Sequence, residues 1–135
     1  MKLLLDTHYL LWMFLDTSKI SKDIQGLLVS VKNEIYYSQA SLWEISIKYS
    51  LGKLFLNGIT PERLYGEIGD SFLLCKKLDN NELVSSYNLP REHKDPFDRI
   101  IIWQAIRGDM VLLSVDTKMD AYERYGLKLY PYKND

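Results

Sequence analysis

Acidic residues lie at widely separated points of the chain, each where an apolar run gives way to a polar residue or a helix start: Asp6, Glu44, Asp98 and Asp116. Asp6 follows the aliphatic residues 3–5, and Asp116 closes the mainly apolar run 110–115. Both runs are typical of buried parallel strands, and ligands of open α/β sheets bind at the carboxyl edge of such strands. Carboxylates gathered there would repel one another, so the pattern indicates a site for a hard divalent cation, Mg²⁺ or Mn²⁺.

Each acid also has a purely structural explanation. Glu44 is the last residue of the sequence Ser41-Leu42-Trp43-Glu44, which has the form of a capping box at a helix start. Asp6 and Asp116 could close strands or cap the helices that follow them. Asp98 falls in the first turn of a predicted helix, where the helix dipole favours a negative charge. The joint occurrence of these acids at one expected sheet edge favours a shared site over four independent caps.

Strands are predicted to alternate with helices along the whole chain. The predicted strands cover residues 3–5, 35–37, 72–76, 110–114 and 127–130. The predicted helices cover residues 7–15, 21–31, 41–50, 60 onward, 79–87, 97–107 and 117–125, with Thr7 and Asp95 as caps of the first and sixth. Alternation of this kind implies parallel pairing with right-handed crossovers. We therefore expect a single domain, residues 1–135, of the three-layer α/β/α class with a five-stranded parallel sheet.

Composition narrows the classes of function. The 135 residues are 47% hydrophobic and include one cysteine, Cys75, so a core without disulfides is expected. The formal net charge of −1 argues against nucleic-acid binding by bulk electrostatics alone. No apolar run approaches the length of a membrane span, and Asp6 interrupts the stretch where a signal peptide would need apolar residues. We expect a soluble, cytoplasmic protein.

Four segments carry a resemblance to a known family: LLLDTH at 3–8, ASLWEISIK at 40–48, HKDPFDRII at 93–101 and LLSVD at 112–116. In order and spacing they resemble the PIN domain, and in particular the VapC-like toxins of bacterial type II toxin–antitoxin systems. The resemblance implies a pocket in which Asp6, Glu44, Asp98 and Asp116 bind Mg²⁺ or Mn²⁺ and cleave RNA. It also implies that the hydroxyls of Thr7 and Ser114 shape that pocket.

Two departures from the family pattern concern the last segment. The family often has a basic or small polar residue before the final acid, where this chain has Val115. The aromatic residue usual shortly afterwards is represented only loosely, by Met119 or Tyr122. Neither departure removes a carboxylate, so both bear on substrate contacts more than on metal binding.

Basic residues flank the second and third segments. His93, Lys94 and Arg99 surround Asp98, and Lys48 follows Glu44 by about one helical turn. We interpret them as possible phosphate contacts, with a solvated helix face as the alternative for Lys48. The sequence leaves open whether Asp95 also contributes to the site.

The first helix is apolar almost all round, from Tyr9 to Phe14, and such a helix needs cover on more than one side. It suggests a homodimer or a groove for a partner, and the resemblance implies a cognate antitoxin as well. Trp43 and Trp103 are expected mainly in the core. The leading interpretation is a metal-dependent ribonuclease toxin. The alternatives are another metal-dependent phosphoesterase and a catalytically silent interaction module that keeps its acids for folding.

Overall fold

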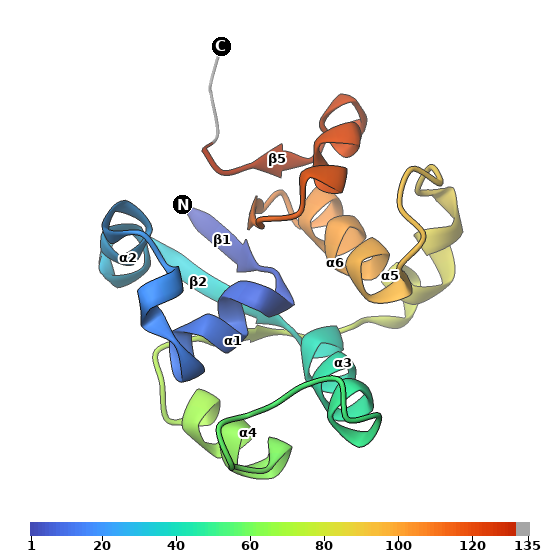
Figure 1. Cartoon of the computed structure of the whole chain (residues 1–135). Coiled ribbons are helices and arrows are strands. Elements are labelled where there is room, and N and C mark those ends of the chain that lie inside the picture. Colours follow the sequence, from blue (N-terminus) through green and yellow to red (C-terminus); the bar gives the residue numbers. More distant parts are fainter. Residues whose placement is uncertain (132–135) are drawn as a thin grey trace.

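A parallel sheet of five strands lies at the centre of the protein, in the order β3-β2-β1-β4-β5 (Figure 1). The structure is a computed structural model that describes residues 1–131. The strands are β1 (Lys2–Leu5), β2 (Glu34–Ser38), β3 (Leu74–Lys76), β4 (Val111–Leu113) and β5 (Lys128–Leu129). Each neighbouring pair is parallel. The predicted fold class is confirmed.

Helices connect successive strands and cover the sheet (Figure 1). The α-helices are α1 (Thr7–Leu15), α2 (Lys22–Val29), α3 (Gln39–Ser50), α4 (Pro61–Gly69), α5 (Asn80–Ser85) and α6 (Pro96–Arg107). Three segments are 3₁₀ helices: η1 (Thr17–Lys19), η2 (Ser86–Asn88) and η3 (Thr117–Tyr125). In the described part of the chain, no helix is both long and apolar enough to cross a membrane.

The core has two parts because successive side chains of a strand point to opposite faces of the sheet. Leu3 and Leu5 pack on one face with buried residues of α1, α2, α3 and α4. Leu4 and Leu112 pack on the other face with buried residues of α6 and η3. The aliphatic run of β1 is therefore covered on both sides, as expected for a central parallel strand.

Several helix starts agree with local sequence signals. Thr60 caps α4 with Pro61 at the first helical position, and Asp95 caps α6 with Pro96 in the same place. Asp79 forms a capping box at the start of α5. Three predicted strands are longer than the observed ones, which cover only Leu74–Lys76, Val111–Leu113 and Lys128–Leu129.

Two predicted caps are wrong. The cap of α1 is Asp6, whose side chain accepts the backbone N–H of Tyr9, and Thr7 is already helical. The capping box at Ser41 does not exist, because α3 begins at Gln39 and its cap is Ser38, the last residue of β2. Glu44 consequently lies in the second turn of α3, where the capping explanation for its carboxylate no longer applies.

The strand order creates a switch point beside β1. From β1 the sheet continues through β2 to β3 on one side and through β4 to β5 on the other. The carboxyl end of a sheet at such a point is where α/β proteins bind ligands. Asp6 follows β1 and Ser114 follows β4, and the N–H of Asp6 donates to the carbonyl of Leu113 at 3.0 Å.

Candidate metal centre

Asp6 is held in place at the carboxyl end of β1. Its side chain is almost fully buried, and its Oδ1 accepts the N–H of Tyr9 at 2.9 Å. The hydroxyl of Ser114 donates to Oδ2 at 2.6 Å. Burial raises the pKa of Asp6, and the hydrogen bonds from Ser114 and Tyr9 oppose that rise. One carboxylate is thus fixed by strands β1 and β4 together.

Glu44 enters the same region from α3 and is 3% exposed. The hydroxyl of Thr7 donates to Oε1 at 2.6 Å and also contacts the hydroxyl of Ser41 at 2.8 Å. Lys48, one turn further along α3, forms an ion pair with Oε2, and this hydrogen bond raises the pKa of Lys48. The buried charge of Glu44 is therefore partly compensated within the protein, and Lys48 is engaged with it.

Asp98 and Asp116 approach each other from the starts of α6 and η3. Their Oδ2 atoms lie 3.1 and 3.0 Å, respectively, from Nε2 of His93. Burial, followed by the nearby charges of Asp95 and Glu44, raises the pKa of Asp98 to about 6. For Asp116, hydrogen bonds from the N–H of Lys118 and from His93 outweigh the effect of burial, so its pKa is lowered. The pKa is therefore raised for Asp98 and lowered for Asp116.

The side chain of His93 is buried and makes its contacts within the protein. Its side chain is 5% exposed, and both ring nitrogens are engaged, Nε2 with the carboxylates and Nδ1 with the N–H of Asp95 at 3.1 Å. Both ring nitrogens therefore already have partners within the protein, and the phosphate contact of His93 stays a prediction. The spacing of His93 and Asp95, two residues apart, is the one sequence signal that could have suggested the contact between ring and backbone.

Arg99 is also committed to the protein itself. It is 9% exposed, and its guanidinium donates to the carbonyls of Leu89 at 2.9 Å, Pro90 at 3.0 Å and His93 at 3.3 Å. The guanidinium therefore already has partners within the protein, and the phosphate contact of Arg99 stays a prediction. Lys94, in contrast, is exposed, and its role as a phosphate contact stays a prediction.

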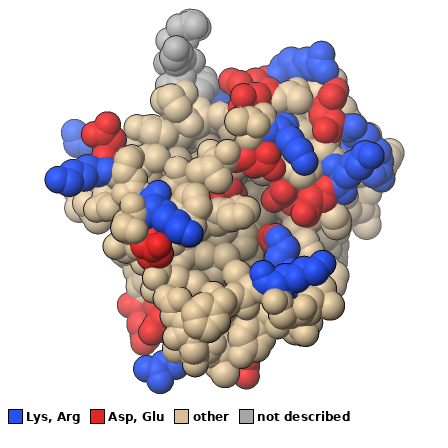
Figure 2. Space-filling model, in the orientation of Figure 1, with Lys and Arg blue, Asp and Glu red and all other residues tan. Residues whose placement is uncertain are grey.

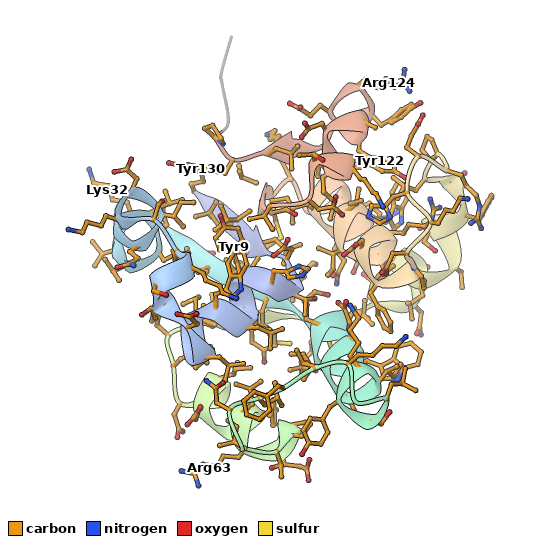
Figure 3. All side chains as sticks on the ribbon, in the orientation of Figure 1. Tyr9, Lys32, Arg63, Tyr122, Arg124 and Tyr130 are labelled. Atoms are coloured by element: carbon orange, nitrogen blue, oxygen red, sulfur yellow. The ribbon has the colours of Figure 1, made fainter. Side chains whose placement is uncertain are left out.

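Tyr122 completes the support of the loop before α6 (Figure 3). Its hydroxyl accepts the N–H groups of Glu92 at 3.0 Å and His93 at 2.8 Å, and it donates to the carbonyl of Pro90 at 2.7 Å. Tyr122 is fully buried. Together with Arg99 it fixes the main chain that carries His93.

The four acids are linked through His93, through Ser114 and through a charge interaction between Glu44 and Asp98. Ligand atoms of His93, Asp98 and Asp116 all lie within 4.8 Å of one another. Ser114 joins Asp6 to this group, since its hydroxyl donates to Asp6 and accepts the N–H of Asp116 at 3.1 Å. Glu44 interacts with Asp98 through its charge. On the face shown in Figure 2, acidic side chains gather around a hollow, and lysine and arginine side chains border it.

The donor set fits a hard divalent cation. Carboxylate oxygens are the ligands that Mg²⁺ and Mn²⁺ prefer. The pKa of Asp98 is raised by burial and then by the negative charges of Asp95 and Glu44, and a bound cation would offset both effects. Asp95 belongs to the scaffold, because its carboxylate accepts the N–H groups of Phe97 and Asp98 as the cap of α6. Its charge nevertheless contributes to the raised pKa of Asp98.

An aromatic pair lies beside this network. Trp43 is 64% exposed, so its predicted place in the core is wrong, whereas Trp103 is half-buried and donates to the hydroxyl of Ser85. The rings of Trp43 and Phe97 meet edge to face, with centroids 5.4 Å apart. Trp43 precedes Glu44 and Phe97 precedes Asp98, so this contact joins α3 to α6 next to two of the acids.

Comparison with known proteins identifies the family. A sequence model of the PIN domain matches residues 3–125, and the chain belongs to the PIN domain family. Comparison with curated protein sequences gives no significant match.

Solved structures with the same fold include three VapBC proteins. VapBC2 from Rickettsia felis, bound to a DNA fragment from their promoter, has a TM-score of 0.67 and 19% identity, covering 96% of this chain and 97% of that chain. DNA-bound VapBC from Salmonella typhimurium has a TM-score of 0.65 and 18% identity, covering 96% of each chain. VapBC-1 from nontypeable Haemophilus influenzae has a TM-score of 0.64 and 15% identity, with the same coverage. At these identities the likeness is one of fold.

Proposed function

We propose that this PIN domain is a metal-dependent endoribonuclease and the toxin of a toxin–antitoxin pair. The observation that carries the proposal is the cluster of buried and half-buried acids at the carboxyl edge of the sheet, with the pKa of Asp98 raised to about 6. Protein folding alone gains little from placing acids where they destabilise one another. A site that binds a cation and a phosphodiester accounts for the arrangement.

The residues that would hold Mg²⁺ or Mn²⁺ are Asp6, Glu44, Asp98 and Asp116. The bound cation would supply water activation and would offset negative charge on the phosphodiester and its leaving oxygen. The protein's own contribution is orientation: Ser114 fixes Asp6, and Thr7 fixes Glu44. Four carboxylates match the charge of two divalent ions, so we expect the second ion to bind weakly until substrate is present.

The proposed substrate is RNA, bound by local contacts. With a net charge of −1 the protein offers no general attraction to a polyanion. A cavity of about 150 Å³ lies beside Glu44 and is lined in part by Lys48 and Lys53, which provides cationic groups close to the acids. Lys94 is a further exposed cation, four residues before Asp98 in the sequence. Single-stranded or loop RNA suits such a site, since its bases and backbone are accessible.

The proposed partners are a cognate antitoxin and a second copy of the chain, in the cytoplasm. The antitoxin is supported by the solved structures of similar fold, which are VapBC proteins. In α1 the side chains from Leu11 to Leu15 pack against the core yet stay partly exposed, so the helix retains apolar surface that a partner could cover. The homodimer stays a prediction that sedimentation of the purified protein would test.

One observation favours the silent-module alternative. Lys48 pairs with Glu44, and His93 lies within 3.1 Å of both Asp98 and Asp116, so protein groups already contact three of the four acids. A domain of this kind could keep its acids for folding alone. Another metal-dependent phosphoesterase activity would use the same acids and differs only in substrate.

An RNA cleavage assay decides between these functions. Purified protein should cleave single-stranded RNA when Mg²⁺ or Mn²⁺ is present and lose this activity in EDTA. Asp6→Asn should abolish cleavage while the fold is retained, and Glu67→Gln, which changes an exposed acid on α4, should not. Metal-independent cleavage, or equal activity of Asp6→Asn and the unmodified protein, would contradict the proposal. Activity on a phosphomonoester but not on RNA would support the other phosphoesterase.

A further inference from the structure

His93 faces two carboxylates from a buried position. Its Nε2 lies 3.1 Å from Oδ2 of Asp98 and 3.0 Å from Oδ2 of Asp116, and its side chain is 5% exposed. A histidine and two aspartates at such distances resemble a metal-binding triad. The same geometry also suits an N–H group that donates to Asp116, lies close to Asp98 and reduces the mutual repulsion of the two carboxylates. The two roles require opposite states of Nε2, which must offer a lone pair as a ligand and a hydrogen as a donor.

The other ring nitrogen distinguishes these roles. The backbone N–H of Asp95 donates to Nδ1 of His93 at 3.1 Å. A nitrogen that accepts a hydrogen bond carries no hydrogen, so a neutral imidazole in this position carries its hydrogen on Nε2. Histidines that bind metal through Nε2 normally donate from Nδ1 to a carbonyl or carboxylate, which is the reverse of the arrangement here.

The scaffold, rather than the carboxylates, sets the position of the ring. Asp95 is the cap of α6, so its N–H is fixed by the start of that helix. The N–H of His93 donates to the hydroxyl of Tyr122 at 2.8 Å, and its carbonyl accepts from Arg99 at 3.3 Å. The main chain of His93 is thus held on both sides by buried groups. These contacts involve none of the four acids, so they do not depend on what those acids bind.

We propose that His93 is a positioning residue, whose Nε2–H donates to Asp116 and faces Asp98, so that it holds the two carboxylates side by side without itself coordinating the cation. The inference rests on the proposed function, in which these two aspartates bind the metal. Its consequence is a site made of oxygen ligands alone. Such a site suits Mg²⁺ and Mn²⁺. It lacks the strong preference for Ni²⁺, Cu²⁺ or Zn²⁺ that an imidazole ligand would bring.

The state of the ring can be measured directly, because the chain contains only two histidines, His8 and His93. Long-range ¹H–¹⁵N NMR spectra of the labelled protein, with His8→Asn to assign the signals, should show His93 as the Nε2–H tautomer at mildly alkaline pH, both in EDTA and in saturating Mg²⁺. Protonation of Nδ1 in either condition, alone or together with Nε2, would overturn the proposal. This readout requires no nuclease activity, so it stands or fails separately from the proposed function.

Metal titration of folded variants supplies the second test. His93→Gln keeps an N–H donor close to the place of Nε2, and His93→Ala removes it. By calorimetry, His93→Ala should weaken binding of Mg²⁺, Mn²⁺ and Ni²⁺ by similar factors of about 10 to 100, and His93→Gln should recover most of the loss. Glu67→Gln, at an exposed residue of α4, is the control. A selective loss of Ni²⁺ affinity in His93→Ala would show that His93 is a ligand. Unchanged affinities, with only a lower melting temperature, would show a merely structural role.

Discussion

Replacing Asp98 by asparagine should stabilise the protein at neutral pH, although it removes a proposed metal ligand. Burial and the charges of Asp95 and Glu44 raise the pKa of the Asp98 carboxyl from 3.8 to about 6. The ionised form is therefore less favourable in the folded protein than in the unfolded chain. Asparagine cannot ionise, and its amide is close to the carboxyl group in size and shape.

The magnitude follows from the change in pKa. Each pKa unit corresponds to about 1.4 kcal/mol, so a rise from 3.8 to about 6 corresponds to at most about 3 kcal/mol. The Asp98 side chain is 22% exposed, and water and small movements reduce this figure. We expect Asp98→Asn to raise the free energy of unfolding by about 1 to 3 kcal/mol at neutral pH, measured without divalent cations.

The sign of the pH dependence is fixed by the direction of the pKa change. An acid whose pKa is higher in the folded state binds its proton more tightly there, so it contributes full stability only below its pKa in the unfolded chain. The contribution of Asp98 should be lost as pH rises from about 4 to about 6 and stay constant above. The stability gap between Asp98→Asn and the unmodified protein should open across that same range.

Urea unfolding followed by circular dichroism, at several pH values in EDTA, measures this gap. Asp120→Asn, at an exposed acid of η3, is the matched control and should show a much smaller gap. Saturating Mg²⁺ should then stabilise the unmodified protein, by about 2.7 kcal/mol at a hundred times the dissociation constant, and Asp98→Asn far less. A gap that is absent, of opposite sign, or independent of pH would refute the argument that Asp98 carries uncompensated charge.

Three further changes test other parts of the site. Tyr122→Phe removes a hydroxyl that accepts two backbone N–H groups, and unfolding in urea should show a loss of about 2 kcal/mol. Asp6→Ala should be less stable than Asp6→Asn by about 1 kcal/mol, because asparagine can still accept the N–H of Tyr9 as a helix cap and alanine cannot. Trp43→Leu, in an Asp98→Asn background that prevents cleavage, should weaken binding of single-stranded RNA by about 5- to 150-fold through loss of base stacking, as measured by fluorescence anisotropy. Phe72→Leu, at an exposed aromatic before β3 and so at the opposite edge of the sheet, should leave that affinity unchanged.

Sequence reasoning succeeded where a signal is local. The alternation of Leu3, Leu4 and Leu5 between two buried faces, and the caps at Thr60 and Asp95, depend on residues within a few positions of one another. Such signals predicted the five-stranded sheet and most helix starts. They also suggested that the four acids approach one edge of the sheet. In the structure the hydroxyl of Ser114 donates to Asp6, and His93 lies close to both Asp98 and Asp116.

The errors concern contacts between residues far apart in sequence. The hydroxyl of Ser38, which caps α3, also donates to Gln104, 66 residues away, and this position at the end of β2 moves the helix start away from Ser41. Arg99 and His93 are basic residues of the kind that contact phosphates. In the structure both are buried, and they form hydrogen bonds with Tyr122 and with the loop before α6. Burial of these basic groups is decided by tertiary packing, which no short motif reports.

The four carboxylates differ in the hydrogen bonds that they accept from the protein. This difference indicates which of them would gain most from a bound cation. Asp6 accepts from Ser114 and Tyr9, Glu44 from Thr7 and Lys48, and Asp116 from Lys118 and His93, as the hydrogen bonds of the described residues show. The carboxylate of Asp98 instead lies 3.1 Å from Nε2 of His93, whose hydrogen bond goes to Asp116. Asp98 also experiences the charges of Asp95, Glu44 and Asp116. A divalent cation would therefore gain most of its electrostatic attraction at Asp98, so loss of this one acid should weaken metal binding more than loss of Asp116.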